Sequence, residues 1–483
     1  MNQIKSLMSD FKSREIPFFS PLGIILFLGS VLYLQHVYVP GFFHDGYLYA
    51  ALGKNAVFRG HWLVPFMSET VYPKFSEHPP LFFMIEGLFF SLVGSSFTAA
   101  RLFAGLWGLV LLGSMFKFAR RFYSENFAFI ATFLLATMPF LIKKVRFPNL
   151  DLPLSICFIL CFYYFMRITE TKKLKHYLKF SILLGLAFLI KGIPALFILL
   201  AIFLFVLVEK NLRTFLLDGK AWGAILFSLM IFALWPLALW MSGEFLIFQE
   251  WIDRQFFATI VNARGQKEFE FFSYFTHLLK YSGPWFVLGC LGITKRPWSH
   301  ATKLCIVAFG SMLLCLSLMK WKYSHYLLPA YPALCILAST FIYPFVKDRM
   351  ILCKNFAFLL ALAGAVTFAI FPLGVQSNRD QGLVEMTRQL PRLNQSKDFI
   401  LVDDAYEFWA WANYLSFVYD ANPRVMLMAE VKKSLEQFSD SIYFMKKSNF
   451  DQIKDALPPK IMQLFYMEKN DVVVLGPDHL AFP

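Results

Sequence analysis

Charged side chains recur beside the long apolar stretches of this sequence. The first group, His44 to Tyr49, contains Asp45 and follows an apolar run near 20–38. A carboxylate at the edge of an apolar region is partly desolvated, which is costly unless it is paired or takes part in chemistry. Asp45 is therefore a candidate general base, or a group that orients an acceptor. An ordinary helix-capping aspartate is the competing interpretation.

A second group, Glu77 and His78, stands directly before Pro79-Pro80. The prolines fix the backbone and prevent a local helix. A histidine is neutral near pH 7 unless a nearby carboxylate stabilises its charged form. Glu77 and His78 are candidate substrate-binding residues, and a solvated loop is the competing interpretation.

Three more groups follow along the chain. Arg146 and Asp151 lie between two apolar stretches, and Asp151 is expected to begin a helix because Pro153 suits its first turn. Asp151 is a second catalytic candidate, with helix capping again the competing interpretation. Lys191 lies between two apolar runs, where a lysine either binds an anion or extends outwards to water. The last group, 320–329, combines Lys320, Lys322 and Tyr326 with aromatic residues typical of a membrane-interface belt.

The elements that must position these groups are apolar helices. Of the 483 residues, 58% are hydrophobic and only 16% are charged, whereas soluble domains carry about 25% charged residues. We therefore expect an α-helical polytopic membrane protein, because such a chain in water would expose large apolar patches. A span needs about 20 apolar residues, which gives about 11 to 13 transmembrane helices. The expected spans lie near 20–38, 99–118, 126–142, 150–167, 177–191, 193–208, 220–241, 281–294, 302–319, 326–346 and 351–374.

The distribution of lysine and arginine predicts the topology. The run 81–93 is short and contains Glu86, so we expect it to lie at the membrane interface. The short basic loops then all fall on one side, which marks that side as cytoplasmic. Residues 1–19 are predicted to be a cytoplasmic N-terminus before a retained first helix. The transmembrane domain is predicted to span 20–377, with periplasmic loops 39–98 and 242–280 and a C-terminus on the outer side.

The C-terminal segment 378–483 has an ordinary density of charged residues. It is expected to form a small soluble periplasmic α/β domain. A strand is predicted at 399–404, a helix at 405–418 and another strand at 471–475.

The formal net charge of +14 does not indicate nucleic-acid binding, because the basic residues occupy short loops between apolar stretches. It is consistent with membrane topology and contact with anionic lipids. The seven cysteines lie in or beside apolar stretches without zinc-ligand spacing. We expect them to be small buried side chains.

The order of these groups resembles the GT-C class of bacterial integral membrane glycosyltransferases, in particular aminoarabinose transferases and protein mannosyltransferases. The resemblance covers residues from near 20 to near 375. It departs from the family at Gly46, where the family has glutamate, and at His78, where it has lysine. The matching segments are 45–49, 77–81, 146–151, 191–194 and 320–329.

The resemblance implies a glycosyltransferase that moves a sugar from a polyprenyl-phosphate donor to a lipid A-like, polysaccharide or protein acceptor at the periplasmic face of a bacterial inner membrane. Asp45 would act as base or orient the acceptor, with Asp151 as second carboxylate, and the anomeric centre would invert. No ligand spacing enforces a cofactor, and a divalent metal on Asp45, Glu77 and His78 stays an open alternative. The residues implied in donor-phosphate or substrate binding are Tyr49, Glu77, His78, Arg146, Lys191, Arg254, Arg264, Lys320, Lys322 and Tyr326.

Two other functions compete with this interpretation. A transporter or flippase of lipid-linked substrates predicts related halves with broken helices, which the sequence does not show. A scaffold for cell-wall assembly would tolerate Asp45→Asn and Asp151→Asn, whereas an enzyme would lose most of its turnover.

Overall fold

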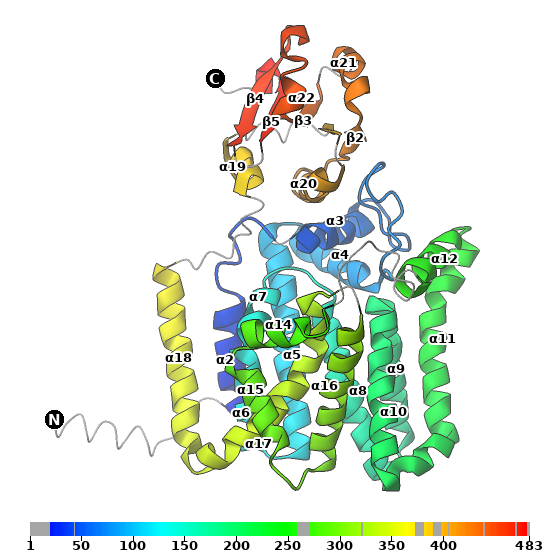
Figure 1. The fold of residues 1–483 in the computed structure, drawn as a ribbon, viewed down its shortest axis with the longest axis vertical. Coiled ribbons are helices and arrows are strands. Elements are labelled where there is room, and N and C mark those ends of the chain that lie inside the picture. Colours follow the sequence, from blue (N-terminus) through cyan, green and yellow to red (C-terminus); the bar gives the residue numbers. More distant parts are fainter. Residues whose placement is uncertain are drawn as a thin grey trace, which may run out of the picture. The chain divides into compact units, whose positions relative to one another are not determined.

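The computed structural model describes residues 20–42, 44–257, 270–319, 322–371, 381–389, 398–403, 405–437, 440–468 and 471–480 (Figure 1). The chain divides into two compact units. The first unit contains residues up to His36, Glu77–Leu81 and Arg101–Leu373. The second contains Val37–Ser76, Phe82–Ala100 and the C-terminal segment from Gly374.

The first unit is built from apolar helices. Helix α9 packs against both α8 and α11, and α17 packs against α15 and α16. The α-helices are α2 (Pro21–Tyr33), α5 (Phe97–Phe122), α6 (Glu125–Ala136), α7 (Pro139–Lys144), α8 (Asp151–Thr171), α9 (Leu174–Lys191), α10 (Leu196–Val208), α11 (Gly219–Met241), α12 (Leu246–Ile252), α14 (Ser273–Ser282), α15 (Pro284–Ile293), α16 (His300–Leu318), α17 (Tyr331–Val346) and α18 (Met350–Ile370). Short 3₁₀ or π turns are η1 (Ile193–Ala195), η2 (Lys210–Leu217), η3 (Asp253–Phe257), η4 (Ser324–Ala330) and η5 (Lys347–Arg349).

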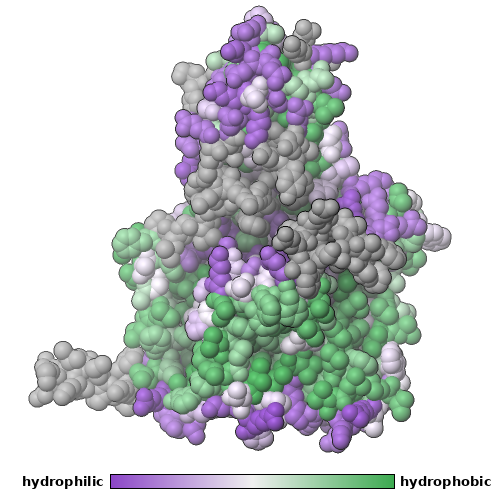
Figure 2. All heavy atoms as spheres, in the orientation of Figure 1, coloured by the Kyte–Doolittle hydropathy of each residue, from purple (hydrophilic) through white to green (hydrophobic). Residues whose placement is uncertain are grey.

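Several of these helices have the length and surface of membrane spans. In the described residues, five helical stretches are long and apolar enough to cross a membrane: α5, α8, α11, α16 and Ser324–Ile370. Large apolar side chains along α11 are more than half exposed, and Figure 2 shows a broad hydrophobic band over the helical region. Such a surface is stable against lipid and not against water. The exposed residues on α11 include Trp222, Leu226, Met230, Leu234 and Leu237.

The expected spans correspond to helices, but four of them are not continuous α-helices. The stretches 193–208 and 326–346 begin with the 3₁₀ turns η1 and η4, and two others are divided between α-helices. The stretch 126–142 divides into α6 and α7, since Pro139 starts a new helix at its first turn. The stretch 281–294 divides into the end of α14 and α15, with Gly283 at positive φ and Pro284 at the first position of α15. Proline lacks the N–H that a continuous helix needs at that position. The stretch 81–93, which we expect to lie at the membrane interface, forms the helix α4 (Leu81–Val93).

The second unit contains a helix that the sequence did not predict, α3 (His44–Phe58). It crosses α4 closely at two glycines. A Cβ built on Gly87 would lie 2.6 Å from the carbonyl oxygen of Gly53, so neither position accepts a larger residue without movement. Glu86, beside this crossing, is fully buried, and neither of its carboxylate oxygens has a hydrogen-bond partner among the described residues.

A small α/β layer forms the C-terminal part of the second unit. Its sheet has the order β2-β1-β3-β5-β4, in which β1 pairs in parallel with β2 and β3, and β5 pairs antiparallel with β3 and β4. The predicted strand 399–404, helix 405–418 and strand 471–475 are observed as β1, α20 and β5. The elements are α19 (Gln381–Gln389), β1 (Phe399–Val402), α20 (Ala405–Tyr419), β2 (Arg424–Met426), α21 (Met428–Gln437), β3 (Ile442–Lys446), α22 (Lys447–Phe450), η7 (Lys454–Ala456), β4 (Ile461–Met467), β5 (Val472–Pro477) and η9 (Asp478–Leu480).

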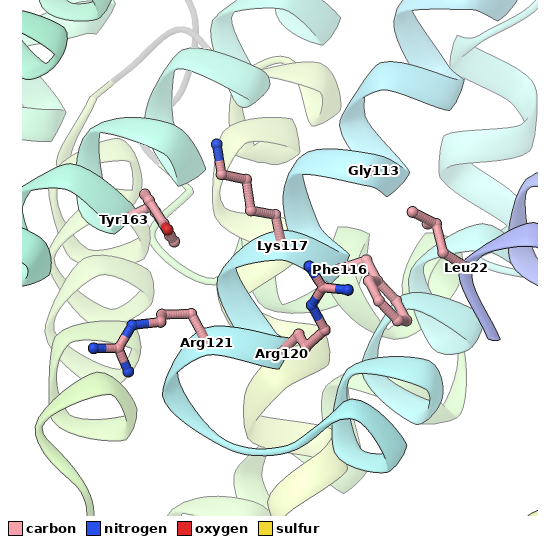
Figure 3. Close-up of a pocket in the computed structure, with 7 residues that line it drawn as sticks. All are labelled: Leu22, Gly113, Phe116, Lys117, Arg120, Arg121 and Tyr163. Atoms are coloured by element: carbon pink, nitrogen blue, oxygen red, sulfur yellow. The ribbon is translucent and has the colours of Figure 1, made fainter. Parts of the chain in front are cut away.

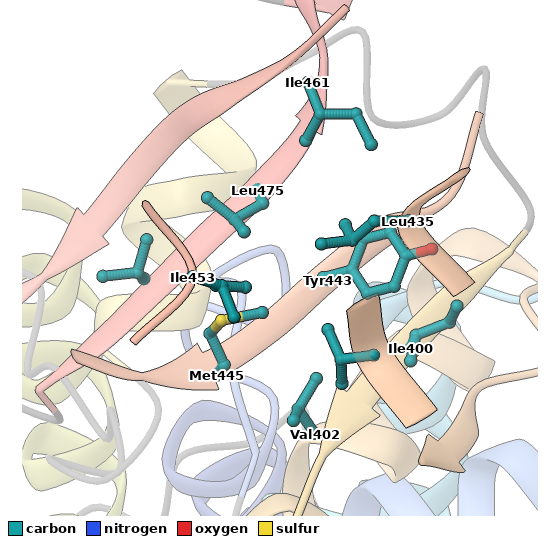
Figure 4. Close-up of a cluster of buried hydrophobic side chains, with 10 residues drawn as sticks. Ile400, Val402, Leu435, Tyr443, Met445, Ile453, Ile461 and Leu475 are labelled. Carbon is teal, nitrogen blue, oxygen red and sulfur yellow. The ribbon is translucent and has the colours of Figure 1, made fainter. Parts of the chain in front are cut away.

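Successive side chains along each strand point to opposite faces of the sheet, so the sheet has a buried core on each face. Ile400 and Tyr443 belong to the cluster that also includes Val431 and Leu435 of α21 (Figure 4). Phe399 and Phe444 contact aromatic side chains of α20 instead. Because both faces are covered, β1 is a continuous hydrophobic run and not an alternating one. Helix α20 also packs against α3.

Candidate active site

An ion pair inside the first unit joins the start of α8 to the end of α9. The Nζ of Lys191 donates to Oδ1 of Asp151, and the two residues are only 6% and 4% exposed. Lys191 therefore does not extend outwards to water. Asp151 is not the helix cap either, since the N-cap residue of α8 is Leu150. A buried charge is tolerated when it is paired, and each of these residues supplies the partner of the other.

Local structure fixes the position of Asp151. Asn149 is buried and its Nδ2 donates to the carbonyls of Lys144 and Phe147, at 2.8 and 2.9 Å, which closes the loop before α8. Its Oδ1 accepts from the N–H of Leu152 at 3.2 Å. The carboxylate of Asp151 thus lies in the first turn of α8, where the helix dipole favours negative charge.

Lys191 is positioned by the glycine that follows it. Gly192 has a φ of 73°, and a Cβ there would lie 2.4 Å from the ring of Trp251 in α12. Only glycine combines this backbone conformation with so close an aromatic contact. Gly192 therefore ends α9 directly after Lys191 and turns the chain into η1.

More polar residues surround this ion pair. Asp151 interacts electrostatically with His325 and Lys144 as well as with Lys191, and His325 also interacts with His78. Lys191 lies 5.5 Å from the centre of the Tyr326 ring. The structure therefore brings together six predicted or neighbouring residues from four parts of the sequence.

Arg146 contributes a second buried cation to the loop before α8. It is 2% exposed, and its Nε and Nη1 have no hydrogen-bond partner among the described residues. Burial lowers its pKa from the ordinary arginine value. The carbonyl of Arg146 accepts a 2.9 Å hydrogen bond from Nη1 of Arg101, at the start of α5. Guanidinium donors without acceptors in a buried loop are suited to an anionic ligand.

Glu77 and Arg254 also lie near one another in the first unit. Nη1 of Arg254 is 4.0 Å from Oε1 of Glu77, a long contact between half-exposed side chains. Nε2 of Gln255 donates to the Glu77 carbonyl at 2.8 Å, which connects η3 to the segment before Pro79-Pro80. The distant arginine of segment 242–280 is thus brought to the acidic motif that precedes α4.

The other predicted site residues are distributed differently. Lys322 donates to the carbonyl of Met319, and burial lowers its pKa, although Glu270 partly opposes this effect. Asp45 is partly exposed in the first turn of α3, and Tyr49 packs against Phe82 and Phe83. Both belong to the second unit. Arg264 and Lys320 lie outside the described residues.

Sequence reasoning missed Lys144 and His325 as site residues. Lys144 is 7% exposed, and its Nζ lies 5.1 Å from the Phe147 ring centre. The sequence analysis did not select it, although a lysine next to an apolar helix end is as costly to bury as Lys191. The Asp151–Lys191 pairing had a usable signal: α8 and α9 have similar lengths and a short connection, so the start of one helix meets the end of the other.

The described residues contain no group of three or more His, Cys, Asp or Glu side chains that could hold a metal ion. The metal alternative for Asp45, Glu77 and His78 therefore gains no geometric support from this part of the chain. All seven cysteines are free. Cys157, Cys161, Cys305 and Cys335 are buried as predicted, whereas Cys290 is exposed and Cys315 and Cys353 are only partly buried.

Comparisons with solved structures identify the fold. The chain superimposes on ArnT from Cupriavidus metallidurans bound to undecaprenyl phosphate with a TM-score of 0.73, at 15% identity, covering 95% of this chain and 98% of ArnT. Its fold is that of ArnT. It also matches the Archaeoglobus fulgidus oligosaccharyltransferase AglB, in complex with an inhibitory peptide and a dolichol-phosphate, with a TM-score of 0.51 at 14% identity over 83% of this chain and 64% of AglB.

Sequence comparisons agree with the ArnT-like fold. Residues 77–240 match the family model of dolichyl-phosphate-mannose-protein mannosyltransferases. An uncharacterized protein of Aquifex aeolicus is 25% identical over 307 residues, or 61% of this chain and 58% of that relative. The match thus spans less than two thirds of the relative's length. The predicted resemblance to GT-C membrane glycosyltransferases is confirmed, together with the helical multi-pass membrane fold and its small C-terminal sheet.

Proposed function

We propose that this chain is a glycosyltransferase that moves a sugar from a polyprenyl-phosphate donor to an acceptor at the periplasmic face of a bacterial inner membrane. The buried Asp151–Lys191 pair, set beside further buried cations in an ArnT-like fold, carries the proposal. The ArnT structure contains undecaprenyl phosphate and the AglB structure contains dolichol-phosphate. Both ligands join a phosphate to an isoprenoid chain, which supports this class of leaving group.

In the proposed reaction, the bond between the anomeric carbon and a phosphate oxygen of the donor breaks, and an acceptor oxygen bonds to the same carbon. Negative charge grows on the departing lipid phosphate. Positive groups fixed in a buried, water-poor site stabilise such charge strongly, because they need no reorganisation. Arg146 supplies donors for this purpose, and Asp151 holds Lys191 in place.

The proposal gives Asp45 the role of accepting the proton when the acceptor is a hydroxyl. A phosphate acceptor, as on lipid A, already carries a nucleophilic oxygen, so that Asp45 would orient it. One displacement by the acceptor inverts the anomeric centre. The proposal leaves the sugar open and includes lipid A, polysaccharide and protein as acceptor classes.

The test is mass spectrometry of lipid A, surface polysaccharide, secreted glycoproteins and polyprenyl-phosphate sugars in a bacterium that carries this gene. A deletion strain is complemented with the wild type, with Asp45→Asn or with Asp348→Asn. Asp348 is exposed in η5, so Asp348→Asn is a matched control for the loss of one carboxylate. We expect Asp45→Asn to lose one glycoform and accumulate its polyprenyl-phosphate sugar, and Asp348→Asn to match the wild type.

Two results would contradict the proposal at different levels. Wild-type glycoforms with a well-expressed Asp45→Asn variant would contradict the proposed role of Asp45. Unchanged glycoforms and lipid-linked sugars in the deletion strain would contradict the proposed glycosyltransferase activity. A changed distribution of a lipid-linked sugar between the two leaflets would then favour the transporter alternative.

A further inference from the structure

A groove lies near the C-terminal end of α5, away from the Asp151–Lys191 pair. It has a volume of about 630 Å³ and combines basic residues with apolar ones (Figure 3). Arg101, near the other end of α5, bonds to the Arg146 loop. Arg101 and Arg121 are separated by about 30 Å of helix, close to the thickness of the hydrocarbon core of a membrane. The groove and the Asp151–Lys191 pair therefore belong to opposite membrane faces.

The basic residues of the groove differ in whether their charge is neutralised. Arg121 forms a 2.6 Å ion pair with Glu170. Lys117 contacts the rings of Tyr163 and Tyr164, and Arg120 lies over the Phe116 ring. Within the described residues, neither Lys117 nor Arg120 has a carboxylate partner. Two exposed positive charges therefore remain at the mouth of the groove.

The apolar part of the groove lies on the same face of α5. Gly113, Lys117 and Arg120 follow at i, i+4 and i+7, a spacing that aligns them along one helix face. A Cβ on Gly113 would meet no atom within 4 Å, so open space continues along this face towards the membrane interior. Leu22 of α2 and Phe116 complete its apolar lining. In Figure 3, Leu22 and Tyr163 flank the α5 side chains from the two sides.

We propose that this groove binds one anionic glycerophospholipid of the membrane. The headgroup phosphate contacts Lys117 and Arg120, and an acyl chain lies over Gly113 between Leu22 and Phe116. Basic pockets between spanning helices on the cytoplasmic side recognise acidic headgroups by charge. The open face at Gly113 provides room for a chain, which a free phosphate ion would not need. The site is independent of the proposed sugar transfer.

The test is native mass spectrometry of the full-length protein in detergent, titrated with phosphatidylglycerol or with phosphatidylcholine of the same acyl chains. We expect one phosphatidylglycerol to bind in preference to phosphatidylcholine. Lys117→Gln/Arg120→Gln should weaken that binding roughly 10- to 30-fold, from the loss of two basic contacts to the headgroup. Gly113→Leu should weaken the binding of both lipids, because the leucine side chain would fill the space of the acyl chain.

The control is Gly223→Leu on α11, another helix glycine with open space around it. It should bind lipid like the wild type, and all variants should keep the wild-type melting temperature. Unchanged phosphatidylglycerol binding in both the charge variant and Gly113→Leu would overturn the proposal. So would equal competition by inorganic phosphate at the same concentration, because the site would then recognise phosphate without the lipid.

Discussion

Two ion clusters in the first unit use the same chemistry in opposite surroundings. Asp151 and Lys191 are each less than a tenth exposed. Glu170 bonds both Arg121 and Arg167, but these three side chains are 22% to 43% exposed. Removing one member of a buried pair costs about 3–5 kcal/mol, whereas an exposed pair contributes about 0.2–1 kcal/mol. The comparison shows that burial, and not the number of ionic contacts, decides which cluster the fold depends on.

The largest effect is expected for Lys191→Met, which leaves the Asp151 carboxylate buried without its partner. Stability should fall by about 3–5 kcal/mol, measured as the melting temperature of the purified protein. The double variant Asp151→Leu/Lys191→Met should recover most of this loss, because an apolar pair can replace a buried ion pair. Both variants should lack the glycoform. A double variant with wild-type glycoforms would show that the ion pair is only structural.

An intermediate effect is expected for Asp420→Asn in the second unit. Oδ1 of Asp420 contacts Lys54 at 3.2 Å and Arg59 at 3.3 Å, and its side chain is 46% exposed. Burial alone would raise its pKa, but Lys54 and Arg59 outweigh this effect and lower it below 3.8. Since the pair is half-exposed, we expect a loss of about 0.5–1 kcal/mol at pH 7.

The pH dependence of this loss has a definite sign. A carboxylate with a lowered folded pKa contributes stability above its unfolded value, and that contribution disappears as the pH falls through the folded value. The difference between wild type and Asp420→Asn should therefore stay constant from pH 7 to pH 5 and shrink below 3.8. Asp451→Asn, an exposed position, serves as the control in the same denaturation series. A difference that grows in acid would contradict the assignment.

The smallest effect is expected for Glu170→Gln. Both of its arginine partners remain in contact with water, so the loss should be below about 1 kcal/mol and should decrease further in high salt. Melting temperatures at low and high ionic strength measure both properties. A loss as large as that of Lys191→Met would mean that burial does not explain the difference between the two clusters.

Sequence patterns predicted the helices and strands of this fold better than the contacts between them. Apolar length identified the spans, and a buried hydrophobic run identified β1, because these signals are local. Pro139 and Gly283 can break a helix, but the apolar runs around them led to the prediction of continuous spans. The Lys54–Asp420 contact joins residues 366 positions apart, so no local pattern indicates it. The site was partly predictable. Asp151 and Lys191 were each selected from the sequence, but their pairing was not predicted, and Lys144 was not selected.

The crossing of α3 and α4 at Gly53 and Gly87 has a consequence for Asp45. Eight residues separate Asp45 from Gly53, or about 12 Å along α3 and about 80° around its axis. With backbone and side chain already touching at the crossing, α3 has almost no freedom to roll. The direction in which the Asp45 carboxylate points therefore depends on Gly53 and Gly87, because their lack of side chains allows this close crossing. A methyl group at Gly53 or Gly87 would push the two helices apart, and it would turn the Asp45 carboxylate without contacting it.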